Sequence, residues 1–379
     1  MSRSSKLVSS LGSLALVGAT TGVLATGPAR AGEAQEAQPR VTTLASGLLS
    51  PLSLAIADNG TRYFTQNFAG LLNRQRPGQR PKVIYANTDG FEVGAVSEDN
   101  GRLRFALSKN NRRGTIMAMP RGGGKPHAIA NLGKYERNTN PDGDVTYGFR
   151  KISQQCAAQM PQDGPPASYQ GTVETHPYAT LLAGGTTYVA DAAANAIFAV
   201  PRPGKVRTVA VLPAVRAYFT AEAAQAYGFP DCVVGKNYWF EPVPTDVEMG
   251  PDGMLYVTTL AGGPEDGSAG MHASVYRINP KNGQRGKVVG GMRSNTGLAV
   301  ARNGDIYVAE LFRRPSSPSA FPGSISKVEA GTQMDHIFVK VPLPADVEVA
   351  NGFMFATTNA LHGENEPAAG KLVRIRIRR

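Results

Sequence analysis

Carboxylate side chains recur in a repeated phrase, two residues after a proline. Asp246 lies in "VPTDVEMGPDGMLYVTT", and Asp346 lies 100 residues later in "LPADVEVANGFMFATT". Such carboxylates could converge as oxygen ligands for Ca²⁺ or another hard divalent ion. Alternatively, each could accept hydrogen bonds from backbone amides of the neighbouring repeat. We favour the backbone role for both aspartates.

Other polar residues occupy equivalent positions at the starts of the same strands or in the loops beside them. The candidate metal ligands, with Ca²⁺ as the cofactor that they would hold, are Glu92, Asp246, Asn295 and Asp346. The candidate binding residues are Glu174, His176, Asp191, Glu241, Asp246 and Glu310. Among the histidines only His176 is well placed for acid–base work, so His176 and Glu174 are the candidate catalytic residues. The sequence contains no G-x-S-x-G, H-E-x-x-H or phosphate-loop motif.

The elements that must position these residues are short strands. The phrase reads as strand, tight turn and strand, with turns such as "DNG", "PDG" and "RNG" that favour hairpins. Copies begin at Pro51, Val93, Pro177, Pro244, Asn295 and Pro344. Most copies are followed by further strands, and units of four antiparallel strands are typical of propeller blades. The sequence therefore predicts an all-β, six-bladed β-propeller.

The last copy has only three strands before the chain ends. We expect the strand at about 40–45, "RVTTLA", to pair with the C-terminal blade at "KLVRIRI" and so close the ring. In that segment Val373 and Ile375 alternate with arginines, which indicates a strand with one buried face.

Two insertions interrupt the repeat, at about 133–172 and 213–240, and both flank the third blade on one face. Cys156 lies in the first insertion and Cys232 in the second, and in an exported protein such a pair favours one disulfide. That bond would staple two long loops, as a mobile lid or as a passive brace. A short helix is expected at 220–228, with Thr220 as its cap and Gly228 as its stop.

The N-terminus has the pattern of a signal peptide. Arg3 and Lys6 precede an apolar run, and small residues end at Ala31, so cleavage is expected near Ala31. Residues 32–39 read as a disordered leader, and 40–379 as a single propeller domain. No other stretch is apolar enough to span a bilayer. We expect a secreted, monomeric protein of the bacterial envelope.

The net charge is +11, and about +8 (11 minus 3) remains once residues 1–31 are removed. Such a charge can attract anionic cell-envelope polymers. No basic stretch is interleaved with aromatic residues, so nucleic acid is not an expected partner.

The wording of the central blades resembles a known family. "ETHPYATLLAGGTTYVADAAANAI" and "GFPDCVVGKNYWFEPVPTDVEMGPDGMLYVTTLAGG" are similar to the ScyD/ScyE family of secreted bacterial proteins, and the resemblance runs from about Val41 to the C-terminus. The resemblance implies an NHL-like six-bladed propeller and export. It supplies no catalytic residue set.

Two functions fit these observations. The first is a binding module that holds a small molecule, glycan or peptide through its channel face and stapled loops. The alternative is a Ca²⁺-dependent lactonase or esterase of the gluconolactonase or paraoxonase type, in which the ion would polarise a carbonyl. We favour binding over catalysis because no nucleophile motif is present.

Overall fold

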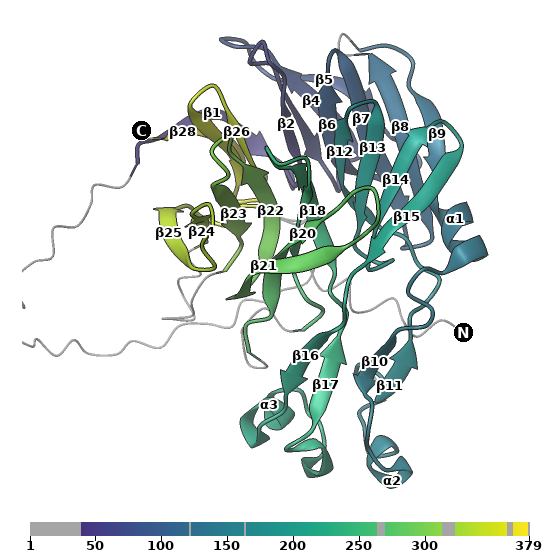
Figure 1. The fold of residues 1–379 in the computed structure, drawn as a ribbon. Coiled ribbons are helices and arrows are strands. Elements are labelled where there is room, and N and C mark those ends of the chain that lie inside the picture. Colours follow the sequence, from purple (N-terminus) through teal and green to yellow (C-terminus); the bar gives the residue numbers. More distant parts are fainter. Residues whose placement is uncertain are drawn as a thin grey trace, which may run out of the picture.

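The computed structural model describes residues 39–120, 123–162, 164–263, 270–312, 323–361 and 367–377. The expected signal peptide, 1–31, and nearly all of the expected leader, 32–39, lie outside these ranges. Within them the chain forms seven four-stranded antiparallel sheets (Figure 1). The all-β, propeller-type architecture expected from the sequence is confirmed.

Five of the sheets each comprise four strands that are consecutive in the chain. The first sheet has β2 (Leu54–Ile56), β3 (Arg62–Gln66), β4 (Leu71–Gln75) and β5 (Lys82–Ala86). The second has β6 (Glu92–Asp99), β7 (Arg102–Lys109), β8 (Arg113–Pro120) and β9 (His127–Asn131). The third has β12 (Pro177–Ala183), β13 (Thr186–Asp191), β14 (Ala196–Arg202) and β15 (Lys205–Val211). The fourth has β18 (Pro244–Met249), β19 (Leu255–Thr259), β20 (Ala273–Ile278) and β21 (Arg285–Met292). The fifth has β22 (Asn295–Val300), β23 (Ile306–Glu310), β24 (Ser324–Val328) and β25 (Asp335–Lys340).

The sixth sheet joins the two ends of the chain. It comprises β26 (Val347–Ala350), β27 (Phe353–Thr358), β28 (Gly370–Arg376) and the N-terminal β1 (Val41–Leu48). β1 pairs antiparallel with β28, which is the pairing expected from the sequence. Val373 and Ile375 of β28 are buried, as their alternation with arginines predicts.

The repeated phrase forms the first hairpin of each of these six sheets. Its turns use glycine at positive φ, as at Gly60 (75°) and Gly304 (88°), where a side chain would be strained. Apolar side chains fill the space between neighbouring sheets; for example, Ile197 of the third sheet packs in one cluster with Val247 and Val257 of the fourth. The first strands contact one another in the order β2, β6, β12, β18, β22 and β26, and β26 also contacts β2.

The seventh sheet is built from the two insertions, and we call it the insertion sheet. Its strand order is β11 (Ser168–Gln170), β10 (Thr146–Phe149), β17 (Asn237–Phe240) and β16 (Val215–Tyr218). The insertions also contain α1 (Leu132–Thr139), α2 (Gln154–Ala157), α3 (Ala221–Ala226) and the 3₁₀ turn η2 (Asp231–Val233). Thr220 caps α3 through its side chain, as expected. In Figure 1 the insertion sheet projects away from the other six sheets.

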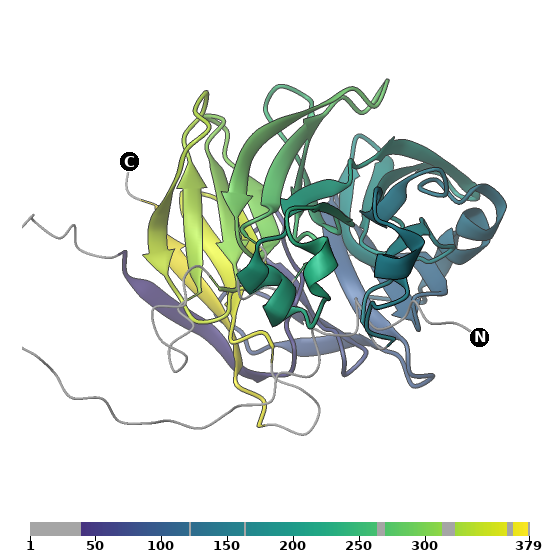
Figure 2. The same ribbon diagram turned by 90° about the horizontal axis from the view of Figure 1, so that it is seen from below.

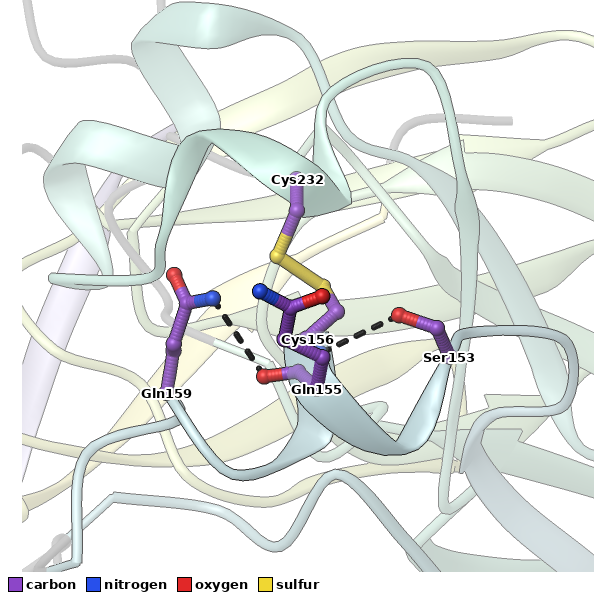
Figure 3. The surroundings of a disulfide bond; sticks show 5 residues. All are labelled: Ser153, Gln155, Cys156, Gln159 and Cys232. Carbon is purple, nitrogen blue, oxygen red and sulfur yellow. Dashed lines mark hydrogen bonds between the residues drawn. A yellow bond between two sulfur atoms is a disulfide. The ribbon is translucent and has the colours of Figure 1, made fainter.

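One face of the insertion sheet carries its own aromatic core. Phe149, Tyr238 and Phe240 of the sheet pack against Phe219 and Phe229. Cys156 of α2 and Cys232 of η2 form the expected disulfide, 5.9 Å apart between Cα atoms, and Ser153 caps α2 beside it (Figure 3). The insertions are therefore not the two long loops that the sequence suggested, because strand pairing between them satisfies their backbone groups and buries aromatic side chains.

The view in Figure 2 looks from the side of the insertions, whose teal and green helices lie in front of the other sheets. None of the described helices is long and apolar enough to cross a membrane.

Candidate functional site

The insertion sheet meets the second and third sheets at a group of five carboxylates, which we call the junction cluster. Its members are Glu136, Asp142, Glu174, Asp191 and Glu241, each of which lies within electrostatic reach of another member. Three of them, Glu174, Asp191 and Glu241, are candidate binding residues from the sequence, which the structure brings together. Glu136 and Asp142 were missed.

Asp191, at the end of β13, holds the backbone that leads into β12. One of its oxygens accepts a hydrogen bond from the Thr175 hydroxyl (2.6 Å), and the other accepts from the backbone N–H groups of His176 (2.6 Å) and Ala194 (3.2 Å). Asp191 is fully buried. Because all of its donors come from the chain around it, its role is to position the neighbouring residues.

Asp142 and Asn195 link the first insertion to the third and fourth sheets. Asp142 Oδ2 accepts hydrogen bonds from the Tyr147 hydroxyl (3.0 Å) and from Asn195 Nδ2 (2.9 Å). Asn195 Oδ1 in turn accepts from the backbone N–H of Val243 (3.2 Å), just before β18. Tyr169 of β11 donates to Glu241 Oε1 (2.9 Å) and so ties the two insertions together at a second point.

Burial shifts the titration of the cluster. It raises the pKa of Glu136 to about 9, and the charges of Asp191 and Asp142 add to the effect. It raises the pKa of Glu241 to about 7 and that of Asp142 to about 6. The hydrogen bonds that these carboxylates accept lower both pKa values, but burial has the larger effect. Burial also raises the pKa of Glu174. Burial and the neighbouring charges therefore favour the protonated form of Glu136.

A pocket opens beside the cluster, with a volume of about 270 Å³, and we call it the junction pocket. It is lined by Arg112, Gly133, Glu136, Arg137, Val173, Glu174 and Thr175. The two arginines are exposed, whereas Glu136 is only 1% exposed. The pocket thus combines two fixed positive charges with carboxyl groups whose raised pKa values favour the neutral form.

His176 follows the pocket residue Thr175 in the chain, but its imidazole ring interacts with Asn111 and Glu92. Its Nδ1 donates to Asn111 Oδ1 (2.8 Å), since an amide oxygen can only accept, and its Nε2 lies 3.6 Å from Glu92 Oε2. Glu92, a candidate metal ligand, is therefore paired with the candidate acid–base residue.

Asp246 and Asp346 play the backbone role that the sequence favoured. Asp246 accepts from the backbone N–H of Leu298 (2.7 Å) in the fifth sheet, and Asp346 accepts from that of Leu54 (2.6 Å) in the first. The second oxygen of each accepts from the N–H of the following residue. Ser53 makes the same kind of link to Val96 (3.0 Å). Each side chain joins its own sheet to the next one.

The two aspartates border a cavity of about 150 Å³ between β2, β6, β12, β18 and β26, which we call the central cavity. Glu248 and Glu348 line it as well. Burial, together with the charges of Asp246 and Asp346, holds the pKa of Glu248 well above its usual range. Burial and the charge of Glu248 do the same to Glu348. The sequence reasoning missed these glutamates, although each follows its aspartate by two residues in the repeated phrase.

The remaining candidates, Glu310 and Asn295, lie on the fifth sheet. Glu310 accepts hydrogen bonds from the Ser326 hydroxyl and from the backbone N–H of Arg293 (3.4 Å). Asn295 Nδ2 donates to Met292 Sδ (3.3 Å). In the described ranges no three or more His, Cys, Asp or Glu side chains form a group that could hold a metal ion. Glu92, Asp246 and Asp346 therefore do not form one, and the assignment of all four metal candidates stays a prediction.

Comparison with known proteins identifies the fold. No protein-family model matches the chain, and no curated protein matches it. Among solved structures, a gluconolactonase from Xanthomonas campestris superposes with a TM-score of 0.53 at 11% identity, over 90% of each chain. A PQQ-bound aldose sugar dehydrogenase from Streptomyces coelicolor gives a TM-score of 0.52 at 12% identity, over 90% of this chain and 99% of that one. A luciferin-regenerating enzyme gives a TM-score of 0.52 at 9% identity, over 89% of this chain and 95% of that one. All three are propeller proteins, and at these identities the likeness concerns the fold alone.

Proposed function

We propose that this chain is an exported, six-bladed β-propeller that binds an acidic sugar unit of an envelope glycan in the junction pocket. The continuous series of contacts between the first strands, from β2 round to β26 and back, supports a closed ring of six blades. The Cys156–Cys232 disulfide supports export, because such bonds persist in oxidising compartments. Membership of the ScyD/ScyE family is part of the same proposal, on the resemblance of the central blades.

The composition of the junction pocket is the observation that carries the ligand class. Arg112 and Arg137 stand exposed at its rim, where guanidinium groups can bind a carboxylate through two parallel hydrogen bonds. Glu174, whose pKa burial raises, lines the pocket as well and can pair with a sugar hydroxyl. A volume of about 270 Å³ is near the lower end of ligand pockets, which suits one sugar ring better than a larger ligand.

A thermal-shift panel tests the ligand class. The protein from Gly32 onward is mixed with uronic acids, their neutral parent sugars and amino sugars at equal concentration. The proposal expects the uronic acids to raise Tm, and the neutral sugars to do so less, because only the carboxylate reaches the arginines. Equal shifts for all of them, or a shift with the amino sugars alone, would contradict the proposal.

Lactone hydrolysis is the second candidate, and the likeness to a gluconolactonase fold is what favours it. The fold family implies a Ca²⁺ ion, but the predicted ligands fit it poorly, because both oxygens of Asp246 and of Asp346 already accept backbone amides. We therefore derive no step through such an ion. Hydrolysis of δ-lactones that depends on added Ca²⁺ and is lost in Glu248→Gln would favour this candidate over the binding module.

A further inference from the structure

Four buried oxygen atoms near the end of α1 have no hydrogen-bond partner among the described residues. They are Glu136 Oε1 and Oε2, Asn140 Oδ1 and Asp142 Oδ1. Glu136 and Asp142 are each only 1% exposed. Buried polar atoms nearly always have a partner, so four unpaired acceptors between residues 136 and 142 require a physical explanation.

The local backbone brings these three side chains near one another, and the charge of Asp142 acts on Glu136. Asn140 ends α1 and donates its backbone N–H to the carbonyl of Glu136 (2.8 Å), and side chains four residues apart lie on the same side of a helix. Asn140 has a left-handed backbone conformation (φ 36°), which ends the helix and starts a turn that contains Asp142. Asn140 Nδ2 donates to the carbonyl of Gly171 (3.1 Å), and a Cβ at Gly171 would lie 2.3 Å from Asp142 Oδ1. Asn140 and Asp142 therefore both lie against Gly171.

Within the described ranges, no positively charged side chain pairs with these oxygens. Arg112 and Arg137 line the junction pocket together with Glu136, yet neither arginine forms a hydrogen bond or an ion pair with the Glu136 carboxyl group. The donors to Asp142, Tyr147 and Asn195, both bind its other oxygen. A buried carboxylate without a donor is strongly disfavoured, and a second carboxylate nearby makes it worse. A cation held between the unpaired oxygens would remove both penalties.

We propose that Glu136, Asn140 and Asp142 form a binding site for a hard divalent cation, with Ca²⁺ as the ion. All four free atoms are carboxylate or amide oxygens, the ligands that Ca²⁺ prefers, and no nitrogen or sulfur ligand is among them. The site uses two carboxylates and one amide, so it differs from a cage of three or more acidic side chains, which the described residues lack.

The site lies at the root of the first insertion and apart from the central cavity. It connects the end of α1 with Gly171, which stands between β11 and β12. With only two charged ligands, the affinity should be that of extracellular calcium modules, with Kd on the order of 10⁻⁴–10⁻³ M. Such an affinity suits an exported protein, and the inference does not depend on which sugar the junction pocket binds.

Calorimetry and thermal unfolding with Ca²⁺ alone test the site. The protein from Gly32 onward is stripped with a chelator and titrated with CaCl₂. We expect one ion per chain and a rise of Tm in millimolar Ca²⁺, and we expect both to be lost in Glu136→Gln and Asp142→Asn. In the presence of chelator, Glu136→Gln should be at least as stable as the wild type, because it removes a buried acid. A lost Ca²⁺ response could then not be attributed to misfolding.

Two control variants locate the ion. Asp58→Asn removes one exposed charge in the turn between β2 and β3, and Glu248→Gln removes one carboxylate of the central cavity. Both should keep the full Ca²⁺ response. The proposal is overturned if the wild type binds no Ca²⁺, if the response survives in Glu136→Gln and Asp142→Asn, or if only Glu248→Gln abolishes it. Sugar binding is measured separately, with Arg112 variants. The Ca²⁺ site and the sugar-binding function can therefore be disproved independently of each other.

Discussion

Asp246 and Asp346 stand at matching positions of two sheets, and each joins its sheet to the next through a backbone amide. Glu248 and Glu348 follow them by two residues and line the central cavity as well, but none of the hydrogen bonds between neighbouring sheets described above involves them. Whether a buried carboxylate positions the chain or remains available to a ligand depends on the donors around it, which residue type alone does not determine.

Removing the Asp346 carboxylate should destabilise the fold. In Asp346→Ala the buried N–H of Leu54 loses its acceptor, which costs about 1–3 kcal/mol of unfolding free energy. Urea unfolding followed by far-UV circular dichroism measures the loss. Asp58→Ala, at an exposed position, is the matched control and should change stability by less than about 0.5 kcal/mol. Equal effects of the two changes would disprove the bridging role.

Glu241 should make stability fall as pH rises. Its pKa is raised from 4.5 to about 7, so the folded state binds more protons than the unfolded state between those values. The contribution is fully present below about pH 4.5 and is lost as pH rises through about 7, with a change on the order of 3 kcal/mol at most. Glu241→Gln should flatten this part of the pH profile, measured as unfolding free energy, whereas Glu222→Gln, at an exposed position of α3, should not. An unchanged slope in Glu241→Gln would contradict the assignment.

At the scale of elements, the insertion sheet is the feature that distinguishes this chain from a bare propeller. Its strands come from two segments on either side of the third sheet, yet they share one aromatic core and one disulfide. These features favour a braced, preformed structure over a pair of loose loops. The Tyr169–Glu241 and Asp142–Asn195 hydrogen bonds anchor this structure beside the junction pocket.

Breaking the disulfide should loosen the insertion sheet before the rest of the chain. The bond closes a separation of 76 residues, for which the chain-entropy estimate is about 4 kcal/mol. Trp239 of β17 is the single tryptophan of the chain, so its fluorescence reports on this sheet alone. In Cys156→Ser/Cys232→Ser, the fluorescence transition should move to lower urea while the far-UV transition moves less. A common shift of both signals would show that the insertion sheet does not unfold separately.

The sequence predicted the hairpin of each repeat, the cap of α3 and the cysteine pair, because those signals are local or depend on few residues. It could not predict the pairing of β10 with β17, since nothing local specifies it. That pairing places the Arg150 guanidinium over the Trp239 ring, 3.9 Å from the ring centre. The two residues are far apart in the sequence, so no local pattern of basic and aromatic residues indicates this contact. Glu136 and Asp142 were also missed as site residues, because neither belongs to the repeated phrase that indicated the other candidates.

At the scale of the whole molecule, the pairing of β1 with β28 joins the two ends of the chain. It covers an edge that would otherwise present unpaired backbone groups and promote association. The repeat period made the propeller-type fold predictable. The junction pocket, the proposed ligand site, lies where the repeat is interrupted, and so the repeat carried no information about it.

Deleting β1 should destabilise the chain and make it associate. A protein that begins at Leu49 exposes the edge of β28, whereas one that begins at Pro39 keeps β1 and serves as the control. We expect Tm to fall, because the shorter protein loses the backbone pairing between β1 and β28. Light scattering after size-exclusion chromatography should show oligomers of the shorter protein alone. A monomer with unchanged Tm would contradict closure through β1.

The central claim is that the junction pocket binds an acidic sugar through its two arginines. The most direct measurement is calorimetric titration of the uronic acid that stabilises the protein most, into the wild type, Arg112→Ala, Arg137→Ala and Arg113→Ala. Arg113 is adjacent and exposed but does not line the pocket. We predict binding about 10- to 150-fold weaker for each of the first two variants, since a charge-assisted hydrogen bond contributes about 1.5–3 kcal/mol, and unchanged binding for Arg113→Ala. Equal affinities in all four proteins, or a loss confined to Arg113→Ala, would place the ligand elsewhere and contradict the account.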